Sequence, residues 1–230
     1  MSQVDLTDNE LIKLIESRHC KRSFHSDKEI PTEIIKKVIS SSQSAPSSKN
    51  TQPWSLVIVR GKKLEELRNL LLKKYDNGEY PEKPQYLNRP SPIPNGWKEK
   101  MEKTSEASYK TKGMDWKNED DQKKHERSNY TFFNAPLFFV ILAPENSVGG
   151  TFLDVGSFMQ NLMLGFSSYN IGSCPQFAMA KFSKTISEFC QIPKEKIIVC
   201  GMSIGYPTND EINNFIPKRD EIENIIQWIE

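Results

Sequence analysis

The sequence predicts a single domain that combines several helices with a few short strands. Three observations favour this fold. Apolar residues recur at helical spacing in several segments, short β-branched runs lie between some of these segments, and no shift in composition divides the chain. With 230 residues and 37% apolar content, the chain is long enough to bury one sizeable core.

The N-terminal part of the chain predicts two amphipathic helices. Thr7 and Glu10 have the spacing of a capping box, and apolar residues that follow share one helix face, so a helix is expected from Thr7 to about Arg18. A second helix is expected to begin near Pro31, because apolar residues recur at helical spacing up to Ile39. Serines and a proline then interrupt this pattern.

The middle of the chain predicts a strand, a helix and a long irregular segment. Residues 40–52 indicate a polar loop, residues 56–59 a buried strand, and the leucines of residues 64–71 a helix. Residues 76–97 carry five prolines and little periodicity, and so long a loop inside a domain is usually functional or disordered. Residues 98–127 are mostly charged, which indicates either exposed helices that cover another part of the molecule or a solvated surface insertion.

The second half is more apolar and supplies most of the predicted core. Residues 136–143 indicate a buried strand, residues 152–166 a helix that is apolar on nearly all sides, and residues 197–206 a second β-rich run. Gly201 interrupts this run, which indicates a bulge or a close approach by another backbone or a ligand. Residues 222–229 predict an amphipathic helix whose apolar face must be buried against this subunit or a partner.

The composition excludes several classes of partner. Lysine and arginine total 31 against 30 acidic residues, so a net charge of +1 provides no global field to attract a nucleic acid or a membrane surface. The apolar stretches are too short or too interrupted to span a bilayer. The four cysteines include no CxxC pair, and the N-terminus lacks the features of a signal peptide, which favours a cytoplasmic protein.

The commonest catalytic signatures are missing. The sequence contains no GxSxG, HExxH, GxxxxGK[ST] or GxGxxG motif, so a Rossmann-type nicotinamide site is not supported. The three histidines, His19, His25 and His125, are not spaced as a metal pair, and no metal site is expected. Any ligand must therefore be bound by less conspicuous clusters of polar side chains.

Three cations lie within five residues near the end of the first predicted helix. Arg18, Lys21 and Arg22 have a spacing suited to a phosphate, which several charge-assisted donors bind well. The alternative is that these side chains offset the dipole at the C-terminus of the helix and bind no ligand. The spacing alone favours this alternative.

A second polar cluster follows the second predicted helix. Residues 45–54 (APSSKNTQPW) place hydroxyl and amide groups beside a buried strand, where they are able to hydrogen-bond the polar edge of a flat heterocycle. Considered alone, the segment is better explained as an ordinary Ser-Pro-Asn turn. The two clusters occur in a fixed order with a third cluster near the C-terminus. This combination favours ligand binding over the helix-dipole and ordinary-turn explanations.

These three clusters together resemble the motifs of the nitroreductase family. Residues 18–24 (RHCKRSF) resemble its RRSxRxF opening, and residues 45–54 resemble its APSxxNxQPW loop. Residues 201–207 (GMSIGYP), followed by Asn214 and Arg219, are similar to its GxxxGYP…R ending. Three further segments are similar to the branch that contains nitrobenzoate reductases, namely NYTFFNAP at 129–136, DVGSFMQNLM at 154–163 and CPQ at 174–176.

The resemblance implies that the chain binds FMN. The residues that it assigns to this cofactor are Arg18, His19, Cys20, Arg22, Pro46, Ser47, Ser48, Asn50, Gln176, Phe177, Ala178 and Arg219. The three arginines would hold the phosphate, the 45–54 loop would line the flavin, and backbone amides near Phe177 and Ala178 would approach flavin N5. His19 replaces the usual arginine, and Cys20 replaces a serine that donates to the phosphate, although a thiol is the poorer donor.

The resemblance also implies a fold. Residues 1–230 would form one α+β domain, a sandwich of helices around a small mixed sheet, with a variable insertion at about 76–130. Two chains would intertwine as a homodimer with two flavins at the interface. The insertion contains prolines and aromatic residues and is separate from the flavin motifs, so residues 80–127 are predicted to decide which acceptor is used.

The implied reaction follows a ping-pong mechanism. NADPH or NADH would reduce the flavin and leave, and a small aromatic acceptor would then be reduced over the same ring, with nitroaromatics as the leading substrate class. No catalytic side chain is expected, because the cofactor carries the redox chemistry. Reductive dehalogenation, or another flavin reaction of the family, is one alternative function, and flavin binding without turnover is another.

Overall fold

A four-stranded sheet forms the centre of the molecule. The computed structural model describes residues 9–230, and the strands lie in the order β1-β2-β4-β3. Their bounds are Ser55–Arg60 for β1, Leu137–Pro144 for β2, Gly172–Gln176 for β3 and Lys196–Gly205 for β4. The α+β class is confirmed, but within the described residues every neighbouring pair is antiparallel, where a mixed sheet was expected. Strand direction was not predictable, because β2 and β4 are buried on both faces and their continuous apolar runs are also typical of parallel strands.

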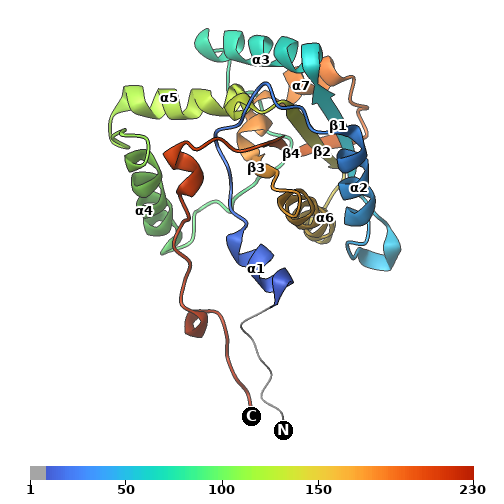
Figure 1. Ribbon diagram of the computed structural model, residues 1–230, viewed down its shortest axis with the longest axis vertical. Coiled ribbons are helices and arrows are strands. Elements are labelled where there is room, and N and C mark those ends of the chain that lie inside the picture. The colour runs from blue at the N-terminus through green and yellow to red at the C-terminus, as the bar shows by residue number, and fades with distance from the viewer. Residues whose placement is uncertain (1–8) are drawn as a thin grey trace.

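Helices cover both faces of the sheet (Figure 1). Phe139 and Ile141 of β2 pack with α2 (Thr32–Ser42) and α6 (Gly149–Ser167). The intervening Phe138 and Val140 pack with α3 (Gly61–Asp76) and α7 (Ser183–Cys190) on the opposite face. This alternation follows from the period of two in a strand. Each buried side chain of this kind contributes roughly 1.5–3 kcal/mol to stability. Because β2 contributes side chains to both apolar layers, it joins them into one core.

The close approach predicted at Gly201 is made by core side chains. A Cβ added at Gly201 would lie 2.3 Å from the ring of Phe138 and 2.6 Å from Cγ of Met179. A bulge also lies nearby, because the register of β2 against β4 shifts between Ile141 and Leu142. The glycine is therefore explained by packing in the core and not by a ligand.

The proline-rich segment is anchored to the core. The carboxylate of Glu82 accepts hydrogen bonds from two backbone N–H groups at the start of α7, at 2.7 and 3.2 Å. The side chain of Gln85 accepts one from a backbone N–H of β4 at 2.9 Å, and the hydroxyl of Tyr86 donates to a β4 carbonyl. Residues 82–86 are thus part of the fold.

Two helices, α4 (Trp97–Lys110) and α5 (Glu119–Tyr130), confirm the exposed helices predicted for residues 98–127. Most of α4 is exposed, whereas α5 buries Tyr130 in the core beside α3. Figure 1 shows the C-terminal segment running next to α4, and an ion pair joins Lys100 of α4 to Asp220. These helices form an outer layer that is fixed to the body mainly through α5.

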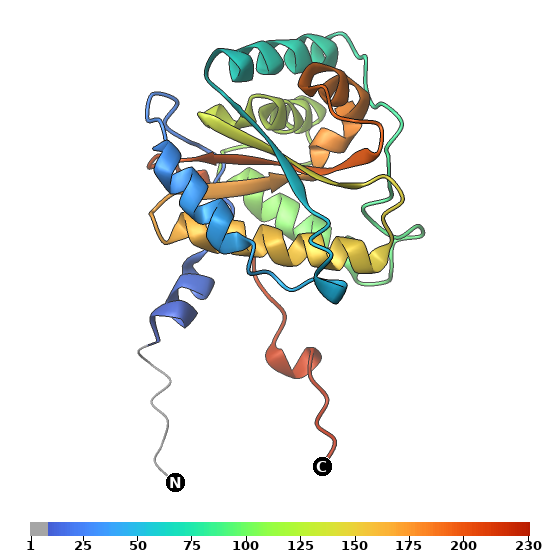
Figure 2. The same ribbon diagram turned by 90° about the vertical axis from the view of Figure 1, so that its right-hand side faces the viewer.

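Both ends of the described chain project from the same side of the body (Figure 2). The first helix, α1 (Glu10–Ser17), is capped by Asn9 and buries no residue, and the predicted capping residue Thr7 lies outside the described residues. The helix predicted for residues 222–229 is wrong, because only Ile222–Asn224 form a single 3-10 turn, η5. So short a segment does not sustain an α-helix without packing against a partner surface.

Two elements were missed by sequence analysis. Strand β3 has the sequence GSCPQ, and glycine and proline are both unfavourable in strands, but β3 lies at the sheet edge, where a proline is tolerated. Helix α7, the second missed element, is only eight residues long.

Within residues 9–230, no helix combines the length and apolar character needed to cross a bilayer.

Candidate functional site

The first and third motifs meet around the buried side chain of Asn213. Its Oδ1 accepts a hydrogen bond from the backbone N–H of Arg22 at 2.7 Å. Its Nδ2 donates to the carbonyls of Ser23 at 2.7 Å and Thr208 at 3.0 Å. Asn213 is only 3% exposed, so these bonds are made away from water and fix the backbone that carries the cationic cluster.

Arg18 faces a cavity of about 290 Å³ between the ends of α1 and α6 and the start of β3, which we call the Arg18 cavity. The residues that line it include His19 and Lys21 but no carboxylate. Nε of Arg18 is buried and has no hydrogen-bond partner within the described residues. An unsatisfied buried donor on a charged group is costly, and an anionic ligand would satisfy it.

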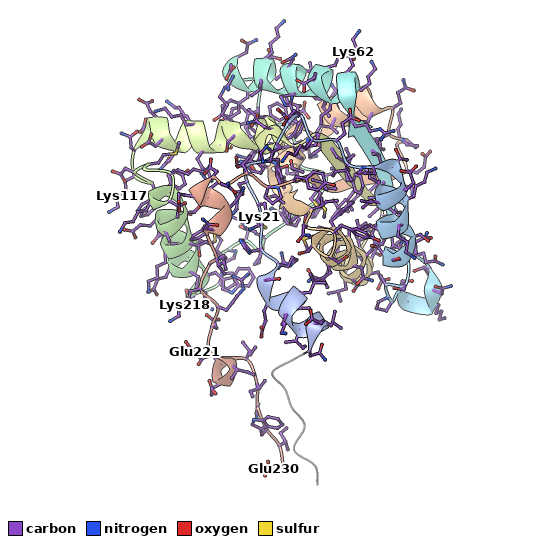
Figure 3. All side chains as sticks on the ribbon, in the orientation of Figure 1. Lys21, Lys62, Lys117, Lys218, Glu221 and Glu230 are labelled. Atoms are coloured by element: carbon purple, nitrogen blue, oxygen red, sulfur yellow. The ribbon has the colours of Figure 1, made fainter. Side chains whose placement is uncertain are left out.

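His19 and Lys21 support each other beside Arg18. Nζ of Lys21 lies 2.8 Å from Nε2 of His19 and 2.7 Å from the carbonyl of Asn213. Nδ1 of His19 lies 2.7 Å from the carbonyl of Ser17. Nε2 of His19 also lies 2.7 Å from the carbonyl of Asn213, so both ring nitrogens face backbone carbonyls and His19 shares the Asn213 acceptor with Lys21. Lys21, labelled in Figure 3, is partly buried, and this burial lowers the pKa of its ammonium group.

Arg22 faces the opposite side of the same segment and contributes to a second cavity. This Arg22 cavity has a volume of about 480 Å³ and is lined by Arg22, Ser23, Thr111, Lys112, Ser128, Thr131, Phe133, Asn134, Asp210, Glu211 and Ile212. Three consecutive lining or adjoining residues, 132–134, adopt positive φ although none is glycine. Backbone strain of this kind is typical of functional sites. In the single chain, Arg18 and Arg22 therefore lie in separate cavities.

A third cavity, of about 380 Å³, is, like the Arg22 cavity, lined in part by residues of α5. We call it the Ala178 cavity, and it is lined by Ser105, Tyr109, Trp116, Gln122, His125, Glu126, Asn129 and Ala178. Ala178 is one of the residues predicted to approach flavin N5, and its neighbour Phe177 is 45% exposed. The side chain of Gln176 instead points inward, because it donates to the carbonyl of Asn129 at 2.8 Å and accepts from the hydroxyl of Ser203.

The 45–54 loop is strained and preorganised. Lys49, Asn50 and Gln52 adopt positive φ, and Oγ of Ser47 accepts a hydrogen bond from the backbone N–H of Gln52 at 3.0 Å. The backbone N–H of Ser48 donates to Asp154 of α6 at 3.2 Å. The loop, with Pro46 before it, is therefore more ordered than the ordinary turn that composition favoured. It lies near the start of α6, whereas the Arg18 cavity lies at the end of that helix.

Arg219 does not join the other two arginines. It is exposed, its Nη1 donates to the carbonyl of Pro217 at 2.9 Å, and it lines a hollow between α4 and the C-terminal segment. Lys218 and Glu221 lie on either side of Arg219 in the sequence. Figure 3 shows both on the C-terminal segment and away from Lys21. Within one chain, then, the structure does not bring Arg219 to the cavity of Arg18.

The pKa of the Cys20 side chain is lower than that of an ordinary cysteine. A hydrogen bond from the buried Cys174 thiol and the positive charges of Arg22 and Arg18 lower its pKa to about 6, although partial burial acts in the opposite direction. Cys174 remains protonated, because the same contact and complete burial raise its pKa. Cys20 is therefore mainly a thiolate at neutral pH. A thiolate accepts hydrogen bonds and has no proton to donate to a phosphate.

We expect Cys20 to be the cysteine that iodoacetamide alkylates first. Burial raises the pKa of Cys190 to about 11 and that of Cys200 to about 12, so both remain thiols at neutral pH. The Cys20 rate should rise with pH through about pH 6, where its thiolate forms, and then level off. Peptide mapping by mass spectrometry measures these rates. In Cys174→Ala the midpoint should move to higher pH, and an unmoved midpoint would contradict the assigned cause.

Sequence analysis missed three residues that organise the site. Asn213 was overlooked in favour of its exposed neighbour Asn214, Asp154 was given no role with the 45–54 loop, and Lys112 lay in a segment described only as charged. The lone acid in the otherwise apolar helix α6 was the available signal for Asp154. No sequence signal identified Lys112, because its position depends on the packing of α4 and α5.

The arrangement fits FMN in two respects. In the part of the chain that the structure describes, Nε of Arg18 has no partner and faces a cavity lined by cations and by no carboxylate, which suits a phosphate. The Ala178 cavity is lined, apart from Glu126 and Ala178, by hydroxyl, amide and aromatic side chains, which suit a flat heterocycle with a polar edge.

Comparisons with known proteins agree with the motifs. The model of the nitroreductase family matches residues 15–206. A 4-nitrobenzoate reductase of Pseudomonas putida is 31% identical over 221 residues, which cover 94% of each chain. A 4-nitrobenzoate reductase of a Nocardioides strain is 29% identical and covers 84% of this chain and 78% of its own. The crystal structure of the FMN-dependent nitroreductase NfnB from Mycobacterium smegmatis, in complex with NADPH, has a TM-score of 0.89 at 23% identity and covers 95% of this chain and 97% of its own.

Proposed function

The chain belongs to the nitroreductase family, and from this premise we propose that it is an FMN-dependent enzyme that uses NADPH or NADH to reduce nitroaromatic compounds. The observation that carries the proposal concerns Arg18: within residues 9–230 its buried Nε has no hydrogen-bond partner, and no carboxylate lines the cavity that it faces. It is the feature that the helix-dipole alternative does not explain, because a side chain that only offsets a dipole is free to remain in water.

The residues proposed to bind FMN form groups that contact different parts of the cofactor. Arg18 and Arg22 bind the phosphate from the segment fixed by Asn213, with His19, Cys20 and Arg219 around it. Pro46, Ser47, Ser48 and Asn50 line the flavin, and the backbone at Gln176, Phe177 and Ala178 approaches its reactive edge. FMN, when bound, supplies the electron-transfer chemistry. The chain's own residues orient the ring, exclude water and hold negative charge, and none acts as an acid or a base.

The positions of the motifs support a homodimer. Asp154, which holds the 45–54 loop, and Ser167, which lines the Arg18 cavity, lie on the same helix α6. At about 1.5 Å per residue, the thirteen steps between them span roughly 20 Å. Because this span separates the loop from the Arg18 cavity within one chain, we propose that the loop of one subunit completes the cofactor site of the other.

Exposed apolar side chains supply a further argument for the dimer. In α1, Leu11, Ile12 and Ile15 are 43–59% exposed, and the C-terminal segment exposes Ile225 and Trp228. Both segments project from the same side of the body (Figure 2). Soluble monomers rarely expose so many apolar groups together, so we propose that a second copy of the chain covers them.

We further propose that residues 1–230 act as a single domain in the cytoplasm, and that the insertion at about 76–130 decides which acceptor is used. The Ala178 cavity supports the second point, because seven of its eight lining residues come from this insertion. Since residues 82–86 anchor the fold, point substitutions test this role better than a deletion does.

One experiment tests the proposed function and assembly. We expect the purified protein to be yellow and to elute in light-scattering chromatography as a dimer that carries one FMN in each chain. NADPH or NADH should bleach the visible absorbance of the flavin, and a nitroaromatic compound should restore it. A colourless protein that does not bind added FMN would contradict the whole proposal, whereas a monomer that retains FMN would contradict only the shared site.

A further inference from the structure

Two cysteines that are far apart in sequence lie opposite each other, Cys20 in the cationic segment of residues 18–22 and Cys174 in the edge strand β3. The backbone N–H of Lys21 donates to the carbonyl of Ser173 at 3.1 Å. In an antiparallel ladder, a bond of this kind flanks a directly opposed, non-hydrogen-bonded pair, and here that pair is Cys20 and Cys174. The second flanking bond would need an N–H group on the residue after Cys174, which is a proline.

The position of this pair matches the geometry of a disulfide. The Cα atoms of a non-hydrogen-bonded pair are typically about 4.5 Å apart, and disulfides join Cα atoms that are about 4.4–6.8 Å apart. Cys20 packs against the small apolar cluster formed by Phe24, Phe133, Ala135 and Cys174. Its side chain also interacts directly with the Cys174 thiol. Little backbone movement is therefore needed to join the two sulfur atoms.

The two thiols differ in the way that a two-step oxidation requires. Cys20 is partly exposed and mainly a thiolate at neutral pH, because the neighbouring thiol and two arginines lower its pKa to about 6. Cys174 is 3% exposed and stays protonated, since its contact with Cys20 and its burial raise its pKa. A thiolate is the form that attacks a peroxide, whereas a buried thiol reacts with a group already in contact with it.

The other two cysteines do not form such a pair. Cys200 is buried in the layer between the sheet and α6, where its sulfur lies 3.9 Å from Sδ of Met159. Cys190, at the end of α7, packs against the layer on the opposite face of the sheet. Within residues 9–230 no group of three metal-ligating side chains occurs, so a metal centre does not explain the contact between Cys20 and Cys174.

We propose that Cys20 and Cys174 form a reversible disulfide when the protein reacts with a hydroperoxide. In the first step Sγ of Cys20 attacks one peroxide oxygen, an S–O bond forms, the O–O bond breaks, and the departing oxygen takes a proton from water. In the second step Sγ of Cys174 attacks the Cys20 sulfur, the S–S bond forms, the S–O bond breaks, and the hydroxide leaves as water with the thiol proton. The two sulfur atoms lose two electrons, and the hydroperoxide is reduced to an alcohol, or to water when it is hydrogen peroxide.

The disulfide changes the cationic segment in two ways. It removes the negative charge of the thiolate beside Arg18 and Arg22, and it joins the segment covalently to the edge of the sheet. A cross-link that the folded state accommodates without strain stabilises a protein by restricting the unfolded chain. In a reducing compartment such a bond is transient, which is typical of a redox-sensing pair. The inference goes beyond the proposed function, because this reaction needs neither a flavin nor a nitro compound.

The test uses the purified full-length protein, which is reduced with dithiothreitol, separated from the reductant and treated with hydrogen peroxide at neutral pH. Peptide mapping without reductant should detect two peptides joined through Cys20 and Cys174, and a non-reducing gel should show that the bond lies within one chain. Dithiothreitol should separate the peptides again. Iodoacetamide should no longer label Cys20 in the oxidised protein. Urea unfolding should have a higher midpoint for the oxidised protein than for the reduced protein.

Matched variants separate the roles of the two cysteines. In Cys174→Ala, Cys20 should still react with peroxide but stop as a sulfenic acid, which dimedone traps. In Cys20→Ala, Cys174 should remain reduced at the same peroxide concentration, because its thiol is buried and protonated. Cys190→Ala is the control, since this cysteine is also partly buried but packs on the other layer, and the disulfide should form as in the unsubstituted protein.

The absence of a linked peptide after peroxide treatment, or a bond that forms only between two chains, would overturn the inference. A lower urea midpoint for the oxidised protein would also overturn it, because the folded state would then not accommodate the bond. Equal oxidation of Cys174 with and without Cys20 would contradict the order of the two steps. A protein that forms the disulfide but binds no FMN contradicts only the proposed function, whereas an active flavin enzyme without the disulfide contradicts only this inference.

Discussion

Replacing Asn213 by alanine should lower the free energy of unfolding by roughly 2–4 kcal/mol, because buried backbone groups would lose their partners. The N–H of Arg22 and the carbonyl of Thr208 make their hydrogen bonds with this side chain, whereas the carbonyl of Ser23 also accepts from the N–H of Thr208 at 3.1 Å. Urea unfolding of the protein without FMN measures the change. The same variant should bind FMN more weakly, since the cationic segment is no longer fixed.

Asn214 provides a matched control for this prediction. It has the same side chain, is adjacent in sequence and is exposed, so Asn214→Ala should change the unfolding free energy by no more than about 0.5 kcal/mol. Equal effects of the two substitutions would show that the buried hydrogen bonds of Asn213 do not hold the two motifs together. The comparison also separates the buried asparagine from the one that the motif pattern singled out.

Arg18→Ala should weaken FMN binding by roughly 1.5–3 kcal/mol, which is about a 10- to 150-fold increase in Kd. The reason is the charge-assisted hydrogen bond that its unpartnered Nε would give to the phosphate. Riboflavin has no phosphate, so its affinity should change much less. Fluorescence titration of the protein without flavin measures both affinities. Equal losses for FMN and riboflavin would show that Arg18 does not bind the phosphate.

Arg219→Ala, measured in the same titration, examines the third arginine. The sequence motif predicts a loss of FMN affinity of the same size, with riboflavin much less affected. Within one chain Arg219 lies on the exposed C-terminal segment, so this loss is expected only when the dimer brings that segment to a cofactor site. FMN affinity that survives the substitution would remove Arg219 from the proposed site and leave Arg18 unaffected.

The sequence by itself determined the elements with strong local signals. The apolar periodicity of α2, α3 and α6 and the apolar runs of β2 and β4 predicted these elements closely, because their side chains repeat with the period of the structure they form. The same logic failed for residues 222–229, where helical periodicity is present but no described surface covers the apolar face. Periodicity shows which face must be buried and does not supply the partner that buries it.

Only the tertiary structure decided how the site is assembled. The motifs named most of the proposed site residues, but they did not show that Arg18 and Arg22 face separate cavities or that Asn213 joins the first and third motifs. Each of these facts depends on contacts between residues far apart in sequence: Arg22 and Asn213, for example, are 191 positions apart. Local patterns reflect the backbone conformation of neighbouring residues, whereas a cavity and its electrostatics arise from the packing of distant segments, which no single segment encodes.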